Sequence, residues 1–313
     1  MHGLEDHPDL NDEKWIREAT RRAEREARAF RPKRRRRPRL PQGRARAITA
    51  AALVVAMLVG ASVWSGFGQD ASQPNAFSGV DLDRPFTGTP AEGWADGEAG
   101  VVAPAAAAVG EFSAEQVAQG YERVRQAVIA SRLDRRVVEA HDVEPFLALL
   151  APDLQDHMRP LFDGRNDVEA GLVVTRVARG SRLLPAAPKV NGWMRAEAGE
   201  PGELVVRTNY VIAYAFAAAE PGRLAGPMDI VAVSRVEMSY VVRSGPDLRP
   251  ESHGLWTDEA SGFSYSMSCE AAERGFLAPW IADRRTGAAG GAEDPEEYFD
   301  PNRPLSTEDD CRE

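Results

Sequence analysis

Asp153 and His157 are the two residues of this sequence whose types and spacing come closest to a reactive pair. They lie four positions apart in a stretch expected to be helical, so both side chains would share one helix face. A metal site or a histidine base oriented by a carboxylate needs such a pair, but no third metal ligand follows at a suggestive spacing. We therefore interpret them as a surface pair, and the sequence predicts no catalytic residue, no metal site and no cofactor.

Motifs of the large enzyme classes are missing from the sequence, which has no nucleophile elbow, zinc-protease helix, phosphate loop or dinucleotide glycine pattern. Tyr210, Tyr214 and Tyr240 project from expected strands on their apolar faces, which is typical of core residues. Acid–base chemistry by tyrosine and aspartate in a pocket stays open as an alternative. Three serines on the polar side of a further strand are explained by ordinary alternation: Ser264, Ser266 and Ser268.

Cys269 and Cys311 are the two cysteines of the chain, which excludes a disulfide-dense scaffold and a cysteine-rich zinc module. The chemistry expected of them is a disulfide, because an extracytoplasmic location favours pairing over free thiols. The bridge would close a loop of about 40 residues and would hold an acidic tail, residues 286–313, against the domain. Cys269 continues the apolar face of Phe263 and Tyr265, so the strand must end before the bridge.

Charge divides the chain into two parts of opposite sign. The whole sequence has 38 basic and 48 acidic residues, for a net charge of −10. Residues 1–46 hold 15 basic and 8 acidic residues, net +7, which leaves 23 basic and 40 acidic residues, net −17, for the remainder. Such asymmetry indicates that the two parts face different surroundings.

An uncharged run of 23 residues separates Arg46 from Asp70. A helix of about 20 residues spans a hydrocarbon layer of roughly 30 Å, so residues 47–67 are predicted to cross the membrane once. A cleaved signal peptide is disfavoured, because its leader would be far too long and no clean Ala-x-Ala site follows. Basic residues cluster on the N-terminal side and place that end in the cytosol: Lys33, Arg34, Arg35, Arg36, Arg37, Arg39, Arg44 and Arg46.

The expected partners follow from this topology. The basic cluster lies beside the membrane, so anionic lipid of the bilayer is favoured over nucleic acid as its partner. Ala52, Ala56 and Gly60 form a stripe of small residues that would let two membrane helices approach closely, and a homodimer through this stripe stays open. A protein partner in the envelope is expected but not identified.

Composition changes divide the chain into five parts. They are a cytosolic basic tail (1–46), a transmembrane helix (47–67), an extracytoplasmic stalk rich in Pro, Gly and Ala (68–110), an extracytoplasmic domain (111–285) and an acidic tail (286–313). The stalk contains Phe86 and Trp94, for which two interpretations stay open. They dock on the folded domain, or they are isolated aromatics in a linker.

The domain is predicted to be α+β. Ser113 with Gln116 three positions later is typical of a helix start, and helices are expected at 144–151 and 152–162. Period-two alternation then predicts strands, the first two unusually long, at 203–217, 229–243 and 263–267, with shorter ones near 171–179 and 191–198. Long strands must coil, so we expect the helices to pack on a curved antiparallel sheet.

This order resembles the nuclear-transport-factor-2-like, or cystatin-like, cone fold over residues 111–285. The resemblance rests on layout: the helix from Ser113, the helices around Phe146 and Met158, and the two long strands. It implies either an assembly subunit, as in members with one N-terminal membrane helix, or a soluble isomerase or dehydratase that uses the cone as a pocket.

We expect a non-catalytic interaction or assembly protein of the bacterial envelope. It would be a single-pass protein of the cell membrane with its C-terminal domain outside. Two alternatives are a tethered enzyme or ligand binder with a cone-shaped pocket, and a transmembrane signalling protein with residues 1–46 as its output.

Overall fold

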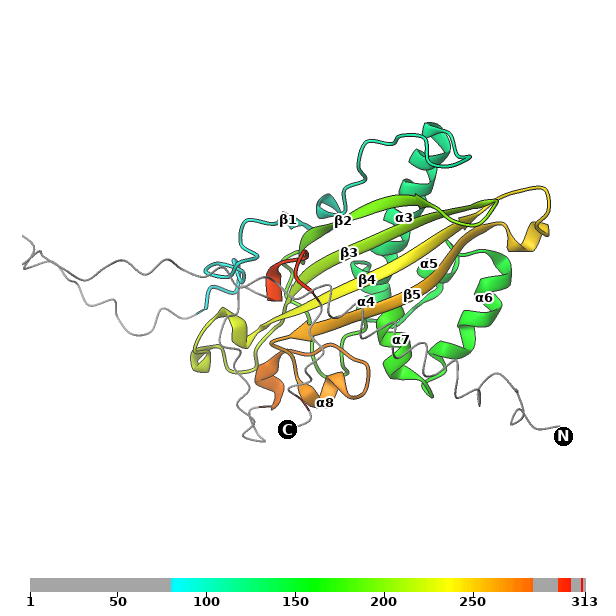
Figure 1. Ribbon diagram of the computed structural model, residues 1–313. Coiled ribbons are helices and arrows are strands. Elements are labelled where there is room, and N and C mark those ends of the chain that lie inside the picture. The colour runs from blue at the N-terminus through cyan, green and yellow to red at the C-terminus, as the bar shows by residue number, and fades with distance from the viewer. Residues whose placement is uncertain (1–79, 284–297, 305–310, 312–313) are drawn as a thin grey trace, which may run out of the picture. The chain divides into compact units, whose positions relative to one another are not determined.

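The computed structural model describes residues 80–283, 298–304 and 311 (Figure 1). Within these ranges no helix combines the length and the apolar character that a membrane crossing requires. The expected transmembrane helix, with its stripe of small residues, and the basic cluster both belong to residues 1–79. They lie outside the described residues and stay predictions.

The domain is built on a five-stranded antiparallel sheet in which each strand pairs with the next in the sequence. The long strands β3 and β4 pair along their whole length, from Glu203 opposite Arg243 to Ala215 opposite Val231. A register shift between β4 and β5 falls at Met238. The expected meander of long strands is confirmed. The strands are β1 (Ala95–Asp96), β2 (Lys189–Ala198), β3 (Glu203–Ala215), β4 (Val231–Arg243) and β5 (Gly254–Tyr265).

Helix α3 begins where the sequence predicts. The Ser113 hydroxyl accepts a hydrogen bond from the Gln116 backbone N–H at 3.3 Å, and the Gln116 side chain accepts one from the Ser113 N–H at 2.8 Å. This reciprocal cap satisfies two N–H groups that a helix start leaves without partners. The α-helices are α3 (Ala114–Arg132), α4 (Arg135–Val138), α5 (Glu144–Leu147), α6 (Pro152–Met158), α7 (Asp167–Val173) and α8 (Cys269–Ala272).

Single turns of 3-10 helix complete the secondary structure. They are η2 (Gly97–Gly100), η3 (Arg159–Phe162), η4 (Pro221–Arg223), η5 (Pro227–Asp229), η6 (Pro250–Ser252) and η7 (Trp280–Asp283).

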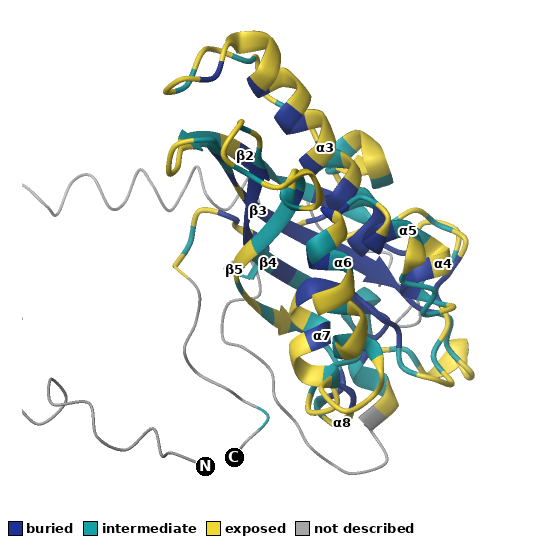
Figure 2. Cartoon of the chain, turned by 90° about the vertical axis from the view of Figure 1, so that its right-hand side faces the viewer, coloured by how far each residue is buried: buried dark blue, intermediate teal, exposed yellow. Residues whose placement is uncertain are grey.

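The main core lies between the helices and one face of the sheet, which we call the inner face. Figure 2 shows the helices α3 to α7 to one side of the strands, with buried residues concentrated where the two layers meet. Tyr214 and Tyr240 of the sheet, Phe146 of α5 and Phe216 are each at most 1 % exposed in this layer. The expected α+β architecture, with helices packed on an antiparallel sheet, is confirmed.

The opposite face, which we call the outer face, is partly covered as well. A second cluster of buried residues includes Phe86 from the expected stalk and Val211, Ala213 and Val233 from β3 and β4. These strand residues alternate with the inner-face set, so both faces of the sheet are apolar at this end and both need cover. Phe86 is 4 % exposed. Of the two interpretations of the stalk aromatics, docking on the folded domain is therefore confirmed.

The described part of the expected stalk thus differs from a tether. Residues 80–110 contribute Phe86, Ala91 and Val101, all at most 4 % exposed, to the packed interior. Arg125 of α3 donates from Nε to the Val101 carbonyl at 2.9 Å and so fixes the segment against the helix. The packed part of the chain therefore extends at least from Val80, upstream of the boundary expected at Glu111.

The strand expected near 171–179 is wrong. Residues Asp167–Val173 form helix α7 instead. Tertiary contact overrides local preference here, because the helix backbone packs closely against Gly275. That glycine has a φ of +73°, and an added Cβ would lie 2.0 Å from the Asp167 carbonyl oxygen. The C-terminal carbonyls of α7 are capped from α3, where Arg132 donates to the Gly171 and Leu172 oxygens.

Candidate functional site

The Asp153–His157 pair does not form a reactive site. Both residues lie on α6, as expected, but the His157 ring lies 3.3 Å from the Asp153 backbone carbonyl rather than from its carboxylate. The carboxylate instead accepts hydrogen bonds from the Ser252 hydroxyl at 2.5 Å and from Arg249 at 3.2 Å. Asp153 therefore anchors the turn before β5. Among the described residues no group of three potential ligands could hold a metal ion.

The three strand tyrosines are core residues. Tyr210, Tyr214 and Tyr240 are 3 %, 0 % and 1 % exposed. The Tyr214 hydroxyl donates to the Arg132 carbonyl at 3.0 Å, while the Tyr210 hydroxyl has no partner among the described residues. Burial raises the pKa of Tyr214 to about 12 and also raises the pKa of Tyr210 and Tyr240. Tyrosines that are neutral and covered by helices cannot accept protons from a substrate at neutral pH.

Arg132 occupies the middle of this inner layer. Its side chain is 4 % exposed, and its guanidinium donates to Thr175 Oγ1 at 3.1 Å in addition to the carbonyls at the end of α7. Burial lowers its pKa, and the negative end of the α7 dipole is the charge that faces it. The inner layer is therefore closed by side chains and by a structural arginine.

We expect the buried tyrosines to make the protein sensitive to alkaline pH. Tyr214 should stay protonated up to about pH 12, whereas a tyrosine of the unfolded chain ionises near pH 10. The folded state then holds a proton that the unfolded state has lost. The free energy of unfolding should therefore be retained below about pH 10 and fall as the pH rises towards 12. Urea unfolding at intervals of pH measures this slope, and an unchanged slope in Tyr214→Phe would contradict the assignment.

The outer face carries a C-terminal segment, residues 298–304, which we call the strap (Figure 1, red). Tyr298 stacks on Tyr265 of β5 with ring centroids 4.3 Å apart. Phe299 meets the edge of Trp94 at 5.6 Å and is 3 % exposed. The two aromatic residues therefore hold the strap between the end of β5 and residues 80–110, which we call the N-terminal segment.

Polar groups of the sheet fix the backbone of the strap. Arg235 of β4 is 2 % exposed, and its Nη1 donates to the carbonyls of Arg303 at 2.5 Å and Asp300 at 3.4 Å. Asn209 of β3 accepts from Arg235 Nε at 3.1 Å and donates to the Pro301 carbonyl at 2.8 Å. Two buried side chains thus bind three backbone carbonyls of the strap, those of Asp300, Pro301 and Arg303. Charge-assisted hydrogen bonds of this kind are stronger than neutral ones.

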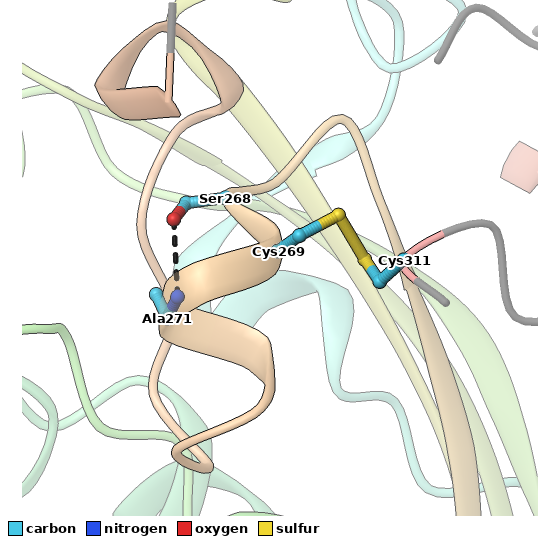
Figure 3. Close-up of a disulfide and its surroundings, with 4 residues drawn as sticks. All are labelled: Ser268, Cys269, Ala271 and Cys311. Carbon is cyan, nitrogen blue, oxygen red and sulfur yellow. Dashed lines mark hydrogen bonds between the residues drawn. A yellow bond between two sulfur atoms is a disulfide. The ribbon is translucent and has the colours of Figure 1, made fainter. Parts of the chain in front are cut away.

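A disulfide binds Cys311, seven positions after the strap, to the domain (Figure 3). Strand β5 ends at Tyr265, and Cys269 is the first residue of α8. Ser268 caps this helix, because its hydroxyl accepts a hydrogen bond from the Ala271 N–H at 3.1 Å. Cys269 and Cys311 form a disulfide with their Cα atoms 5.3 Å apart. The predicted pairing is confirmed, and the strand ends before the bridge as the pairing requires.

The rest of the outer face, beyond the strap, carries tryptophans and arginines. Trp193 and Arg195 of β2 lie opposite Asn209 and Arg207 in the register, so they share the face of the strap site. The side chains of Arg195 and Arg207 are 65 % and 47 % exposed. Tryptophan and arginine are the residues most enriched at binding hot spots. We call this set the Trp–Arg surface: Trp193, Arg195, Arg207, Arg243 and Trp256, of which Trp256 is partly buried and also packs against the main core.

Ion pairs and ring contacts hold the arginines in place. Glu197 accepts from Arg195 at 2.9 Å and from Arg207 at 3.1 Å, and the latter hydrogen bond is the main cause that lowers the pKa of Glu197. Arg243 lies 4.2 Å above the Trp256 ring. Arg243 also pairs with Glu203 at 2.8 Å, so three arginines face two carboxylates and the surface keeps a net positive charge. Its aromatic and guanidinium groups are held in position by these contacts.

A cleft of about 440 Å³ lies where the N-terminal segment meets β2. Three of its five charged side chains, Arg84, Asp96 and Lys189, are in ion pairs. Lys189 contacts Asp96 at 2.9 Å, and Arg84 contacts Asp81 at 2.9 Å. Both cations that line the cleft are therefore already neutralised by carboxylates. It is lined by Asp83, Arg84, Pro85, Phe86, Thr87, Glu92, Asp96, Ala186, Ala187 and Lys189.

Comparisons of the chain with protein-family models, with curated proteins and with solved structures gave no match. The functional argument therefore rests on the geometry of the two faces. The inner face is filled by side chains, and the outer face offers the Trp–Arg surface.

Proposed function

We propose that the protein is a non-catalytic, membrane-anchored interaction protein of the bacterial cell envelope. Residues 47–67 would tether it to the cell membrane, with the basic cluster against anionic lipid in the cytosol and the described domain outside. The observation that carries the proposal is the Trp–Arg surface, a pre-organised part of the sheet in which Arg195 and Arg207 are exposed while the other face of the sheet is used by the core.

Two further observations support this function. The disulfide between Cys269 and Cys311 suits an oxidising compartment. The filled inner layer gives no support to the alternative of an enzyme or ligand binder, because such a protein needs a pocket where Tyr214, Tyr240 and Phe146 are at most 1 % exposed. No feature of the described residues favours the signalling alternative.

A site-specific photocrosslinking experiment in native membranes tests the proposal. A photoreactive residue at Arg195 is expected to capture a defined envelope protein, whereas the same residue at Glu122, which lies on the exposed side of α3, is not. The full chain should resist carbonate extraction of the membranes, because a spanning helix is not released by high pH.

Charge reversal supplies the matched controls for this experiment. Arg207→Glu, with the probe at Arg195, is expected to reduce the yield of the crosslinked product at least tenfold. Arg274→Glu, just after α8, should leave it unchanged, since among the described residues the ion pair of Arg274 is with Glu270, four positions earlier, at 3.2 Å. Equal products from both probe positions, or a chain recovered in the soluble fraction, would count against the proposal.

A further inference from the structure

The strap meets the sheet as a bound peptide meets its receptor. It is separated in sequence from the residues that it contacts: Asn209 and Pro301, whose atoms are 2.8 Å apart, lie 92 positions from each other. Two aromatic anchors, Tyr298 and Phe299, fill the apolar part, and the backbone carbonyls of the following residues point at buried donors. Anchors in pockets beside a row of backbone contacts are a recurring mode of peptide recognition.

The receptor side is a built site in the sheet itself. We call it the acceptor site: Trp94, Asn209, Arg235, Phe263 and Tyr265. Arg235 and Asn209 are 2 % and 3 % exposed and turn their donors towards strap carbonyls. Arg235 is held in position by Glu237, whose Oε1 accepts from Nη2 at 2.5 Å. These donors recognise a peptide backbone, while the aromatic pair supplies the specificity.

The segment that connects the strap with the domain is long enough for the strap to reach the acceptor site of a second copy. Fourteen residues, 284–297, connect the described end of η7 with the strap. At about 3.4 Å per residue such a length reaches up to roughly 48 Å, comparable to the width of a domain. A strap taken from a second copy would make the same contacts, because the two sequences are identical. Exchange of an identical element is a low-cost route to a dimer.

We propose that the acceptor site of one copy also binds the strap of a second copy, with Cys311 of the strap donor closing a disulfide to Cys269 of the acceptor. The inference goes beyond the proposed function, since it concerns the covered part of the outer face and a second copy of this chain. A membrane tether would raise the local concentration of copies and so favour exchange.

The chemistry of the exchange balances without an added oxidant. Two intrachain disulfides become two interchain disulfides. A catalytic thiolate attacks one sulfur, the released cysteine thiolate attacks the disulfide of the other copy, and the last step expels the catalytic thiolate again. No electrons are gained or lost overall. Once the catalytic thiol is removed, the interchain disulfide that formed beside a docked strap can no longer exchange and is retained.

Two complementary cysteine variants of the full chain test the inference. The Cys269→Ser chain keeps Cys311 and can only donate a strap, and the Cys311→Ser chain keeps Cys269 and can only accept one. Neither can form the intrachain bridge. When the two are co-expressed with different tags and oxidised with glutathione disulfide, we expect a heterodimer on a non-reducing gel that a dithiol separates. Two tagged copies of the unmodified chain are expected to form the same dimer.

A donor–acceptor asymmetry distinguishes strap exchange from random collision of thiols. Phe299→Ala in the donor is expected to lower the heterodimer yield at least tenfold. The same substitution in the acceptor, whose own strap is not used, should leave the yield unchanged or raise it, and it controls for any loss of folding. Absence of the heterodimer, or an equal loss in both placements, would overturn the inference. Crosslinking from Arg195 does not depend on the strap, so failure here leaves the proposed function standing.

Discussion

Replacing both Cys269 and Cys311 with serine is expected to lower the free energy of unfolding by roughly 4 kcal/mol. The disulfide joins residues 42 positions apart, and a loop of that length restricts the unfolded chain by about this amount on the entropic account. The folded state loses little directly, because the bridge lies at the end of a segment that aromatic and polar contacts also hold. Urea unfolding monitored by tryptophan fluorescence measures the difference.

Reduction of the unmodified chain provides the control for this prediction. A dithiol should lower its stability to that of the Cys269→Ser, Cys311→Ser chain and leave the latter unchanged. A loss below about 1 kcal/mol would contradict the prediction, and it would mean that the tail is held by its non-covalent contacts alone.

The inner layer of the fold was predictable because its signals are local and repeated. Ser113 with Gln116 marks the start of α3, and the alternation around Tyr210 and Tyr240 marks the two long strands. Each signal depends on residues within a few positions, and the structure has each one near where the sequence placed it. Strand β5 was recognised only at its end, because its first part, from Gly254, alternates poorly and carries Asp258 in an exposed position.

The cover of the outer face was not predictable from such patterns. Val211 and Ala213 occupy alternate positions of β3 that a sheet with one buried face leaves to solvent, and small residues there give no strong signal. The segments that cover them come from both ends of the domain, and their composition is typical of linkers and tails. Only Phe86 and Trp94 pointed to docking. Contacts between residues so far apart in sequence leave no periodic trace.

The acceptor site was missed for a related reason. Alternation places Arg235 on the polar side of β4, where a charged residue is usually solvated. The structure buries it under the strap, because its donors meet carbonyls that no sequence pattern reveals. A usable signal was the aromatic pair Tyr298 and Phe299 within an acidic tail. Two adjacent large aromatic side chains indicate burial against the domain, because they gain free energy when they leave water.

Substitution of Phe299 by alanine is the second prediction with a large expected effect. Phe299 is 3 % exposed and packs between Trp94 and Tyr265, so its loss removes a buried ring and leaves a cavity. We expect the free energy of unfolding to fall by about 3 kcal/mol in the oxidised chain. Asn302→Ala in the same strap is the control, and its effect should stay within about 0.5 kcal/mol, because Asn302 is exposed and its hydrogen bonds within the described part of the chain are to Asp300.

The size of the Phe299 effect should depend on the disulfide. A strap can detach without unfolding the rest, so no substitution in it can cost more than its own docking free energy. The disulfide restricts how far the strap can move from the domain and so strengthens its docking. The largest possible cost of a substitution in the strap is therefore higher in the oxidised chain. Phe299→Ala should therefore cost at least about 1 kcal/mol less in the Cys269→Ser, Cys311→Ser background than in the oxidised chain. Additive effects in this double-mutant cycle would show instead that the ring stabilises the whole domain, and that the strap is not a separable element.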